Sequence, residues 1–250
     1  MSLLRLPFLG AAWLLATLIA TGQATGASSC APRVFESAGY IVCTFDLRSH
    51  ALRLFWRDDS GKPYGGFAPL LEKFGRDGIV FAMNAGMYQA DLSPVGLYIE
   101  DSRTLVRAST ASGPGNFHLK PNGVFYFDDR SAGVLTTEEF LSRRKKAAFA
   151  TQSGPMLVIR GRIHPRFLKD STSRKIRNGV GVRDRHTVIF AISEAPVTFW
   201  EFGRLFRDGL RVQDALFLDG SISSLYAPAL RRSDSLFPMG PIVAAYKRDD

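Results

Sequence analysis

Cysteine and histidine are scarce in this sequence, and the motifs of several common enzyme classes are missing. Only two cysteines and four histidines occur in 250 residues. The chain has no His-Glu-x-x-His or Cys-x-x-Cys motif, and it also lacks a Gly-x-Ser-x-Gly elbow and a Walker loop. The histidines have no spacing typical of a metal site. We therefore expect no resident cofactor or metal, although a divalent cation held by oxygen ligands leaves little trace in a sequence and stays open.

The first 27 residues have the pattern of an export signal. Arg5 supplies a short basic region, an apolar run follows over residues 8–20, and small residues precede candidate cleavage sites at Ala24 and Ala27. The apolar run is short for a membrane span, yet an uncleaved anchor stays an alternative. We predict a periplasmic or secreted protein whose single domain comprises residues 28–250, with no membrane association after cleavage.

The remaining chain is basic, and its cysteines fit an oxidising compartment. The formal net charge is +9, and Arg5 is the only charged residue of the signal, so the exported part carries +8. A basic surface attracts phosphates and acidic glycans, and export argues against nucleic acid as the partner. Export also favours a disulfide between Cys30 and Cys43 over two separate thiols.

Short apolar runs outnumber helical patterns along the chain. Residues 40–45 and 52–56 read as strands of a hairpin, and residues 79–83 and 214–218 read as buried strands. Helices are expected from Pro69 to Phe74, from a capping box at Thr136 and Glu139 to about Lys145, and after a second capping box at Thr198 and Glu201. This order of elements predicts an α+β fold with a mixed, largely antiparallel sheet and a few packed helices.

The run from Leu216 to Ser224 is the most informative stretch. An apolar strand ends in Asp219, and Gly220 and the hydroxyl residues Ser221, Ser223 and Ser224 follow. A carboxylate at the end of a buried strand is costly unless it is paired or used, and the glycine permits a sharp turn beside a ligand. An Asx-turn that closes the strand is the simpler alternative.

Four other blocks combine amide side chains, glycines and cations at the edges of short strands. Such groups recognise hydroxyls and anionic oxygens through several hydrogen bonds. The blocks are Asn84-Ala85-Gly86-Met87-Tyr88, Lys120-Pro121-Asn122-Gly123-Val124-Phe125, Gln152-Ser153-Gly154-Pro155-Met156-Leu157 and the segment from Arg174 to Arg183.

With the Asp219 segment, these blocks resemble the phosphodiester glycosidase family in content and order across most of the exported chain. Two residues depart from the family pattern, Ala85 and Ser221, which stand where glycine is expected. The resemblance implies a hydrolase that removes a sugar from a sugar-1-phosphodiester, with a phosphate monoester as the leaving group. It does not fix the sugar or the oligomeric state.

The resemblance and the chemistry together suggest roles for particular side chains. We expect Asp219 to lie near the anomeric carbon as nucleophile, base or binder, and Arg183 to face it and clamp phosphate through its planar fork, with Asn84 as a third catalytic group. Glu100 and Asp184 are candidates for a second carboxylate. The expected substrate-binding residues are Gly86, Lys120, Asn122, Gly123, Gln152, Ser153, Arg174, Gly220, Ser221, Ser223 and Ser224.

Two other functions use the same groups. A non-catalytic exported module that binds anionic cell-envelope glycan would need the cations and amides but would show no turnover. A phosphodiesterase would break the P–O bond instead of the C–O bond.

Overall fold

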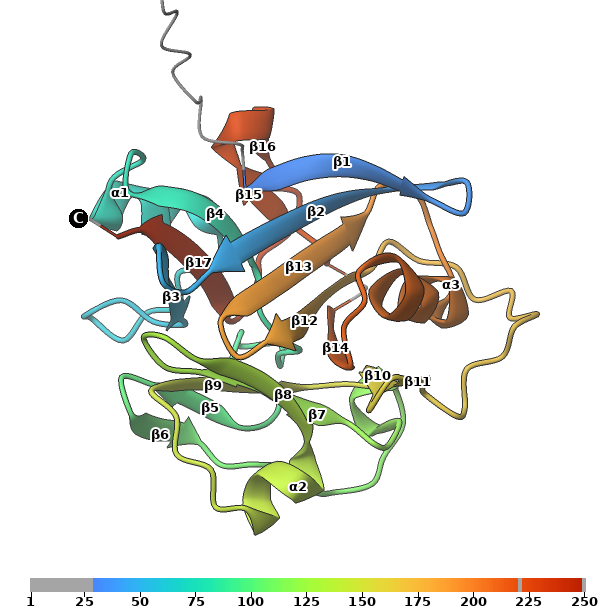
Figure 1. Cartoon of the computed structure of the whole chain (residues 1–250). Helices are drawn as coiled ribbons and strands as arrows, with labels where there is room; N and C mark the ends of the chain where they lie inside the picture. Colours follow the sequence, from blue (N-terminus) through green and yellow to red (C-terminus); the bar gives the residue numbers. More distant parts are fainter. Residues whose placement is uncertain (1–28, 220–221, 249–250) are drawn as a thin grey trace, which may run out of the picture.

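The computed structural model describes residues 29–219 and 222–248, and every strand pair within them is antiparallel. The predicted export signal lies outside these residues. The strands form three sheets that meet around a common interior (Figure 1). The structure confirms the α+β class with a largely antiparallel arrangement in one domain, but it divides the strands among three sheets.

The largest sheet carries the disulfide and the candidate residues Asp219 and Arg183. Cys30 and Cys43 face each other across its first two strands and are joined by the predicted disulfide. In spatial order its strands are β1 (Cys30–Phe35), β2 (Ala38–Asp46), β13 (Thr187–Ser193), β12 (Asn178–Asp184), β14 (Asp214–Asp219), β10 (Met156–Ile159) and β11 (Arg162–Ile163).

The other two sheets have five strands each. The second contains β16 (Arg232–Ser233), β15 (Leu225–Ala227), β4 (Ile79–Asn84), β17 (Ile242–Lys247) and β3 (His50–Phe55), with β4 at its centre. The third contains β6 (Arg103–Val106), β5 (Tyr98–Glu100), β9 (Phe149–Ser153), β7 (Gly123–Phe127) and β8 (Ala132–Thr136).

The predicted hairpin between residues 40–45 and 52–56 is wrong. Both segments are strands, but β2 pairs with β1 and β13, whereas β3 pairs with β17 in another sheet. Asp46 accepts hydrogen bonds from the backbone and side chain of Arg48, which closes a turn that redirects the chain. A polar linker of this length allows the two strands either to pair as a hairpin or to enter different sheets. The alternation of apolar and polar residues therefore could not show which strands β2 and β3 pair with.

Short helices lie at the margins of the sheets (Figure 1). They are α1 (Phe67–Phe74), η1 (Asn116–His118), α2 (Thr137–Ser142), α3 (Phe199–Arg204), η2 (Leu205–Gly209) and η3 (Pro228–Leu230). The capping box predicted at Thr198 and Glu201 is present at the start of α3, whose last turn continues as the π-helical η2. The Thr136 side chain also caps α2, but this helix ends at Ser142 rather than near Lys145.

The core is centred on aromatic rings contributed by all three sheets. Phe45 from β2, Phe81 from β4, Phe125 from β7 and Phe190 from β13 are fully buried. The ring centroids of Phe81 and Phe190 are 4.8 Å apart, and those of Phe125 and Phe190 are 5.9 Å apart. This packing fixes the sheets against one another, and it thereby holds the ends of β4, β12 and β14 together.

No helix in the described part of the chain is long and apolar enough to cross a membrane.

Candidate active site

Two asparagines connect three strand ends at the centre of the candidate site. Asn178, at the start of β12, accepts a hydrogen bond from the backbone N–H of Asp219 at the end of β14, at 2.8 Å. The Asn178 Nδ2 donates to Oδ1 of Asn84, at the end of β4, also at 2.8 Å. The backbone N–H of Ser224 donates to the same Asn84 oxygen at 2.9 Å. We call Asn84, Asn178 and Asp219 the amide–carboxylate cluster.

The orientation of the Asn84 amide follows from this bonding. Two donors converge on Oδ1, so the remaining atom is the Nδ2 donor. This Nδ2 is buried and has no hydrogen-bond acceptor within residues 29–219 and 222–248. A buried donor without an acceptor costs stability, and such groups call for an explanation such as a role in binding.

Asp219 is held at the end of a strand whose preceding residues are buried. Its fractional exposure is 8%, and its carbonyl oxygen accepts a hydrogen bond from Ser223 Oγ at 2.8 Å. Ser153 Oγ from β9 donates to the carbonyl oxygen of Leu218 at 2.7 Å, which fixes the strand end from the third sheet. The predicted binding residues Gly220 and Ser221 lie outside the described residues.

Tyr88 lies in the electrostatic field of Asp219. Burial raises the pKa of Tyr88 to about 12, and the negative charge of Asp219 adds to the rise. The phenol is therefore neutral at physiological pH, and its hydroxyl donates to the carbonyl oxygen of Pro238 at 2.7 Å. This residue belongs to the first block that the sequence analysis singled out, but its phenol was not recognised as a site group.

A hollow of about 600 Å³ opens beside Ile222, Ser223 and Ser224. Ser223 and Ser224, both predicted to bind substrate, lie on its wall, and Ser223 Oγ connects this wall to the Asp219 carbonyl. Arg174, also predicted, lines it as well. Further polar lining comes from Lys175, Ser193, Glu194, Arg232 and Asp234.

Two carboxylates that sequence reasoning missed line this hollow. Asp234 and Glu194 both pair with Arg232, at 2.9 and 3.7 Å. The carboxylates considered from the sequence lie elsewhere: Glu100 accepts the Tyr98 hydroxyl in the third sheet, and Asp184 caps a turn at the far end of β12. Neither residue lines the hollow, so the structure does not support either as a second site carboxylate. The sequence could not show this, because it does not reveal which residues line a hollow formed by distant loops.

Arg177 is a buried cation within the block from Arg174 to Arg183, and the sequence analysis gave it no role of its own. Its side chain is 1% exposed, and its guanidinium lies 3.6 Å above the ring centroid of Phe199. It donates to the carbonyl oxygens of Val197 and Ser173, at 2.8 and 3.1 Å. Burial lowers the pKa of Arg177 to about 10, so it remains charged at neutral pH. The residue fixes the segment that delivers Arg174 and Lys175 to the hollow and Asn178 to Asp219.

Three predicted substrate-binding residues have other bonding partners. Gln152 Oε1 accepts from the backbone N–H groups of Leu97 and Ser109, while its Nε2 donates to Ser109 and Thr137. Asn122 donates to Phe117 and accepts from Thr137, and Lys120 donates to the carbonyl oxygen of Thr110. None of these three side chains lines the hollow. The geometry gives Gln152 and Asn122 a framework role, and substrate binding by any of the three stays a prediction.

Gly86 and Gly123 are also required by close packing. A Cβ atom at Gly86 would lie 2.9 Å from Thr151 Oγ1, and one at Gly123 would lie 2.9 Å from the carbonyl oxygen of Leu135. Both distances are below normal contact distances. Glycine at these two positions therefore allows neighbouring segments to pack closely. A role of Gly86 and Gly123 in substrate binding stays a prediction.

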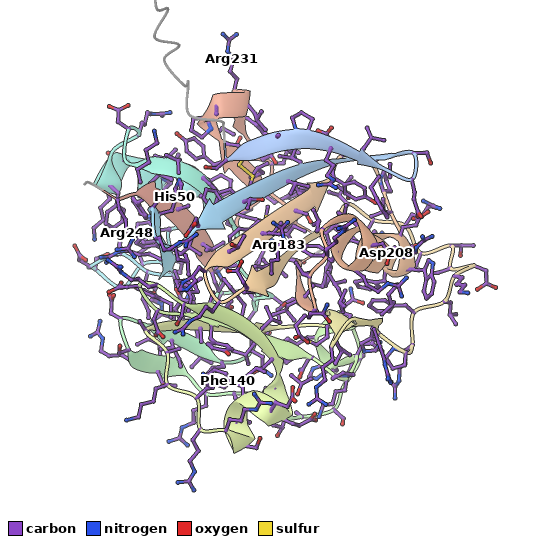
Figure 2. All side chains as sticks on the ribbon, viewed as in Figure 1. His50, Phe140, Arg183, Asp208, Arg231 and Arg248 are labelled. Carbon is purple, nitrogen blue, oxygen red and sulfur yellow. A yellow bond between two sulfur atoms is a disulfide. The ribbon has the colours of Figure 1, made fainter. Side chains whose placement is uncertain are left out.

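The expectation that Arg183 faces Asp219 is wrong. Asn178 pairs with Asp219 at one end of β12, whereas Val182 pairs with Asp214 at the other. Five residues of strand separate Asn178 from Arg183, or about 16 Å. Arg183 is exposed on the large sheet (Figure 2), where its guanidinium donates to the carbonyl oxygen of Leu210. Arg177 and Arg183 belong to the same sequence block, but they lie at opposite ends of β12 because the strand is extended.

Metal ligands do not gather near these residues in the described chain. No group of three histidine, cysteine, aspartate or glutamate side chains adopts a metal-binding arrangement in residues 29–219 and 222–248.

Comparisons with known proteins place this architecture in a family. The phosphodiester glycosidase family profile matches residues 77–235. The Escherichia coli (strain K12) protein named "Uncharacterized protein YigE" is 36% identical over 184 residues, which cover 73% of this chain and 72% of that protein.

Solved structures share the fold at low sequence identity. The catalytic domain of zebrafish N-acetylglucosamine-1-phosphodiester alpha-N-acetylglucosaminidase superposes with a TM-score of 0.60 at 12% identity, covering 88% of this chain and 82% of that one. A putative exported protein from Burkholderia pseudomallei superposes with a TM-score of 0.53 at 10% identity, covering 84% and 74%. The profile match and the identity to the bacterial relative establish that this chain belongs to the phosphodiester glycosidase family.

Proposed function

We propose that the protein is an exported hydrolase that cleaves the glycosidic C–O bond of a sugar-1-phosphodiester. One observation carries the proposal: Asp219 and Asn84 are hydrogen-bonded to Ser223 and Ser224, which line a hollow together with several cations. Family membership supports the reaction class. The Cys30–Cys43 disulfide supports an oxidising, extracytoplasmic location.

The leaving group explains why this site needs little acid catalysis. A phosphate monoester has a second ionisation near pKa 6, so it departs as a stable anion. The demand on the protein is to stabilise an oxocarbenium-like sugar and a departing phosphate. Asp219 supplies negative charge for the first task. Ser223, Ser224 and the cations of the hollow supply hydrogen bonds and positive charge for the second.

The balanced reaction adds water across one bond. The anomeric C–O bond breaks with its electron pair going to the phosphate oxygen, and oxygen from water forms the new bond to the anomeric carbon. Asp219 either receives the proton of this water or attacks the sugar first and is then released by water. The Asn84 Nδ2 donates to a sugar hydroxyl or phosphate oxygen in both cases.

The test is release of free sugar from defined substrates. Purified protein is incubated with methyl esters of several α- and β-linked sugar-1-phosphates, including N-acetylglucosamine-1-phosphate, with and without a chelator. We expect release of sugar together with methyl phosphate from at least one member. Binding of these esters without turnover would contradict the proposal and favour the glycan-binding alternative.

Isotope labelling separates the two bonds that hydrolysis could break. In oxygen-18 water, C–O cleavage places the label in the released sugar. Label found in the phosphate instead would overturn C–O cleavage and identify a phosphodiesterase. The chelator arm shows whether a divalent cation takes part.

A further inference from the structure

Two hollows share lining residues from the segment 234–237. The first is the hollow of about 600 Å³ beside Ser223 and Ser224. The second has a volume of about 490 Å³, and its lining is largely apolar, with Tyr64, Phe67, Leu92 and Met239 among its residues. The two hollows share Asp234, Leu236 and Phe237. A ligand that fills both must therefore cross this segment.

Large apolar side chains are exposed where the hollows meet. Leu236 is 85% exposed and Phe237 is 56% exposed. A single exposed apolar residue is ordinary, but adjacent ones that continue into an apolar hollow form a surface that gains free energy when it is covered. We call Leu236 and Phe237 the apolar ridge.

The residues on both sides of the ridge are fixed by hydrogen bonds. The backbone N–H of Asp234 donates to Leu225, and the backbone N–H of Met239 donates to Gly65, both at 3.0 Å. The Tyr88 hydroxyl also donates a hydrogen bond to the carbonyl oxygen of Pro238. Tyr88 itself lies in the electrostatic field of Asp219. The ridge is thus anchored in part to β15, which pairs with β4, the strand that ends at Asn84.

Among the described residues, one of the three cations that line the first hollow forms no ion pair, although Arg232 pairs with Glu194 as well as with Asp234. Arg174 pairs with Glu201 at 2.7 Å, and Arg232 pairs with Asp234 at 2.9 Å. Lys175 has no carboxylate within 4.0 Å in the described part of the chain. A hollow with an unpaired ammonium, two serine hydroxyls and an adjoining apolar surface is complementary to a phosphate that carries an apolar substituent.

We propose that the substrate is a sugar-1-phosphodiester whose second ester group is an apolar chain. The phosphate lies in the first hollow near Lys175, and the chain crosses the apolar ridge into the second hollow. This inference rests on the proposed function and specifies its leaving group: hydrolysis releases the sugar and the phosphate monoester of an apolar alcohol. The same chemistry could come from a lipid phosphate or from a soluble ester, and the experiment separates these sources.

The first measurement compares turnover of esters that differ only in chain length. The probes are the methyl and octyl esters of α-N-acetylglucosamine-1-phosphate and α-glucose-1-phosphate, used below the critical micelle concentration. Since each buried methylene contributes about 0.8 kcal/mol at most, partial burial of the chain should raise kcat/KM for the octyl ester about a hundredfold over the methyl ester. Equal kcat/KM values would overturn the inference and leave the proposed function intact.

Variants locate the preference on the protein. The double variant Leu236→Ser/Phe237→Ser should lower the ratio of kcat/KM for the octyl ester to kcat/KM for the methyl ester at least tenfold. Lys175→Gln should lower kcat/KM for both esters by a similar factor of about ten. Leu168→Ser is the matched control, because Leu168 is 66% exposed and lies outside both hollows. An octyl preference that survives in the double variant would contradict the assignment to the ridge.

Binding of a product analogue tests the subsite without catalysis. Octyl phosphate should bind at least tenfold more tightly than inorganic phosphate in calorimetry, and the double variant should remove most of this difference. Equal affinities would overturn the inference even if no sugar ester were hydrolysed, so its failure is distinguishable from failure of the proposed function. Turnover of a hexadecyl ester embedded in phosphatidylcholine vesicles assigns the natural source to a membrane lipid, whereas turnover of the soluble octyl ester alone assigns it to soluble esters.

Discussion

Two clusters of buried amides occupy this molecule, and they differ in whether their hydrogen bonds are complete. Gln152 is bonded at both ends to Leu97, Ser109 and Thr137. Asn84 receives two donors at its oxygen, yet its Nδ2 has no acceptor in the described residues. A closed cluster stabilises the fold, whereas an open one beside a hollow retains a group for a ligand. Buried amides with a structural role are thus distinguished from candidate ligand-binding amides by whether their hydrogen bonds are complete, and not by residue type.

The largest expected effect comes from breaking the closed cluster. Gln152→Ala leaves the buried N–H groups of Leu97 and Ser109 without their acceptor, so we expect the free energy of unfolding to fall by about 4 kcal/mol. Urea unfolding measures this change, and sugar release per folded molecule should stay unchanged. The exposed Gln89→Ala is the control. A loss of turnover per folded molecule would show that the closed cluster also serves the substrate.

The open cluster should respond in the opposite manner. Asn84→Ala removes the Nδ2 donor and the acceptor that holds Asn178 and Ser224, so we expect kcat to fall about a hundredfold. Steady-state kinetics at equal folded concentration measure the loss, with the exposed Asn116→Ala as the control. If turnover persists at the wild-type level, Asn84 belongs to the framework as Gln152 does.

Acid should weaken the packing that supports the open cluster. His164 stacks on Phe167, which stacks on Phe199 beneath Arg177. Burial lowers the pKa of His164 to about 4, below the usual value of 6.5. The unfolded chain therefore gains a proton first as pH falls, and stability that is fully present above pH 6.5 is lost on the way to pH 4.

The size of this loss follows from the two pKa values. Between pH 7.5 and pH 5, His164 should account for about 2 kcal/mol of lost stability. Urea unfolding at both pH values checks this, and His164→Gln should flatten the pH dependence. An unchanged slope in His164→Gln would contradict the neutral, buried state of this ring.

The smallest effect is expected at Arg183. Because this residue is exposed and lies at the far end of β12 from Asn178, Arg183→Ala should leave kcat/KM within about twofold of wild type. Its stability should change by about 0.5 kcal/mol or less, as is usual for surface substitutions. A tenfold loss of kcat/KM in the same assay would show that Arg183 contacts the substrate, which would contradict its position at the far end of β12.

The sequence was sufficient for the fold class, the disulfide and the strand that delivers Asp219, because these depend on local patterns. A continuous apolar run predicted β14, and the capping residues predicted α3. It was insufficient for the pairing of β2 and β3 and for the position of Arg183, since both depend on which strands meet in space. The buried position of Arg177 was missed for a related reason: a single arginine carries no local sign that aromatic rings from distant segments will enclose it.

The most direct test of the account is the turnover of Asp219→Asn on the sugar-1-phosphate ester that the wild type hydrolyses fastest. This change keeps the size of the side chain and removes its charge. If Asp219 carries the chemistry, kcat should fall about a thousandfold while the midpoint of urea unfolding stays close to that of the wild type. Retention of a tenth or more of wild-type kcat in a folded variant would contradict the account.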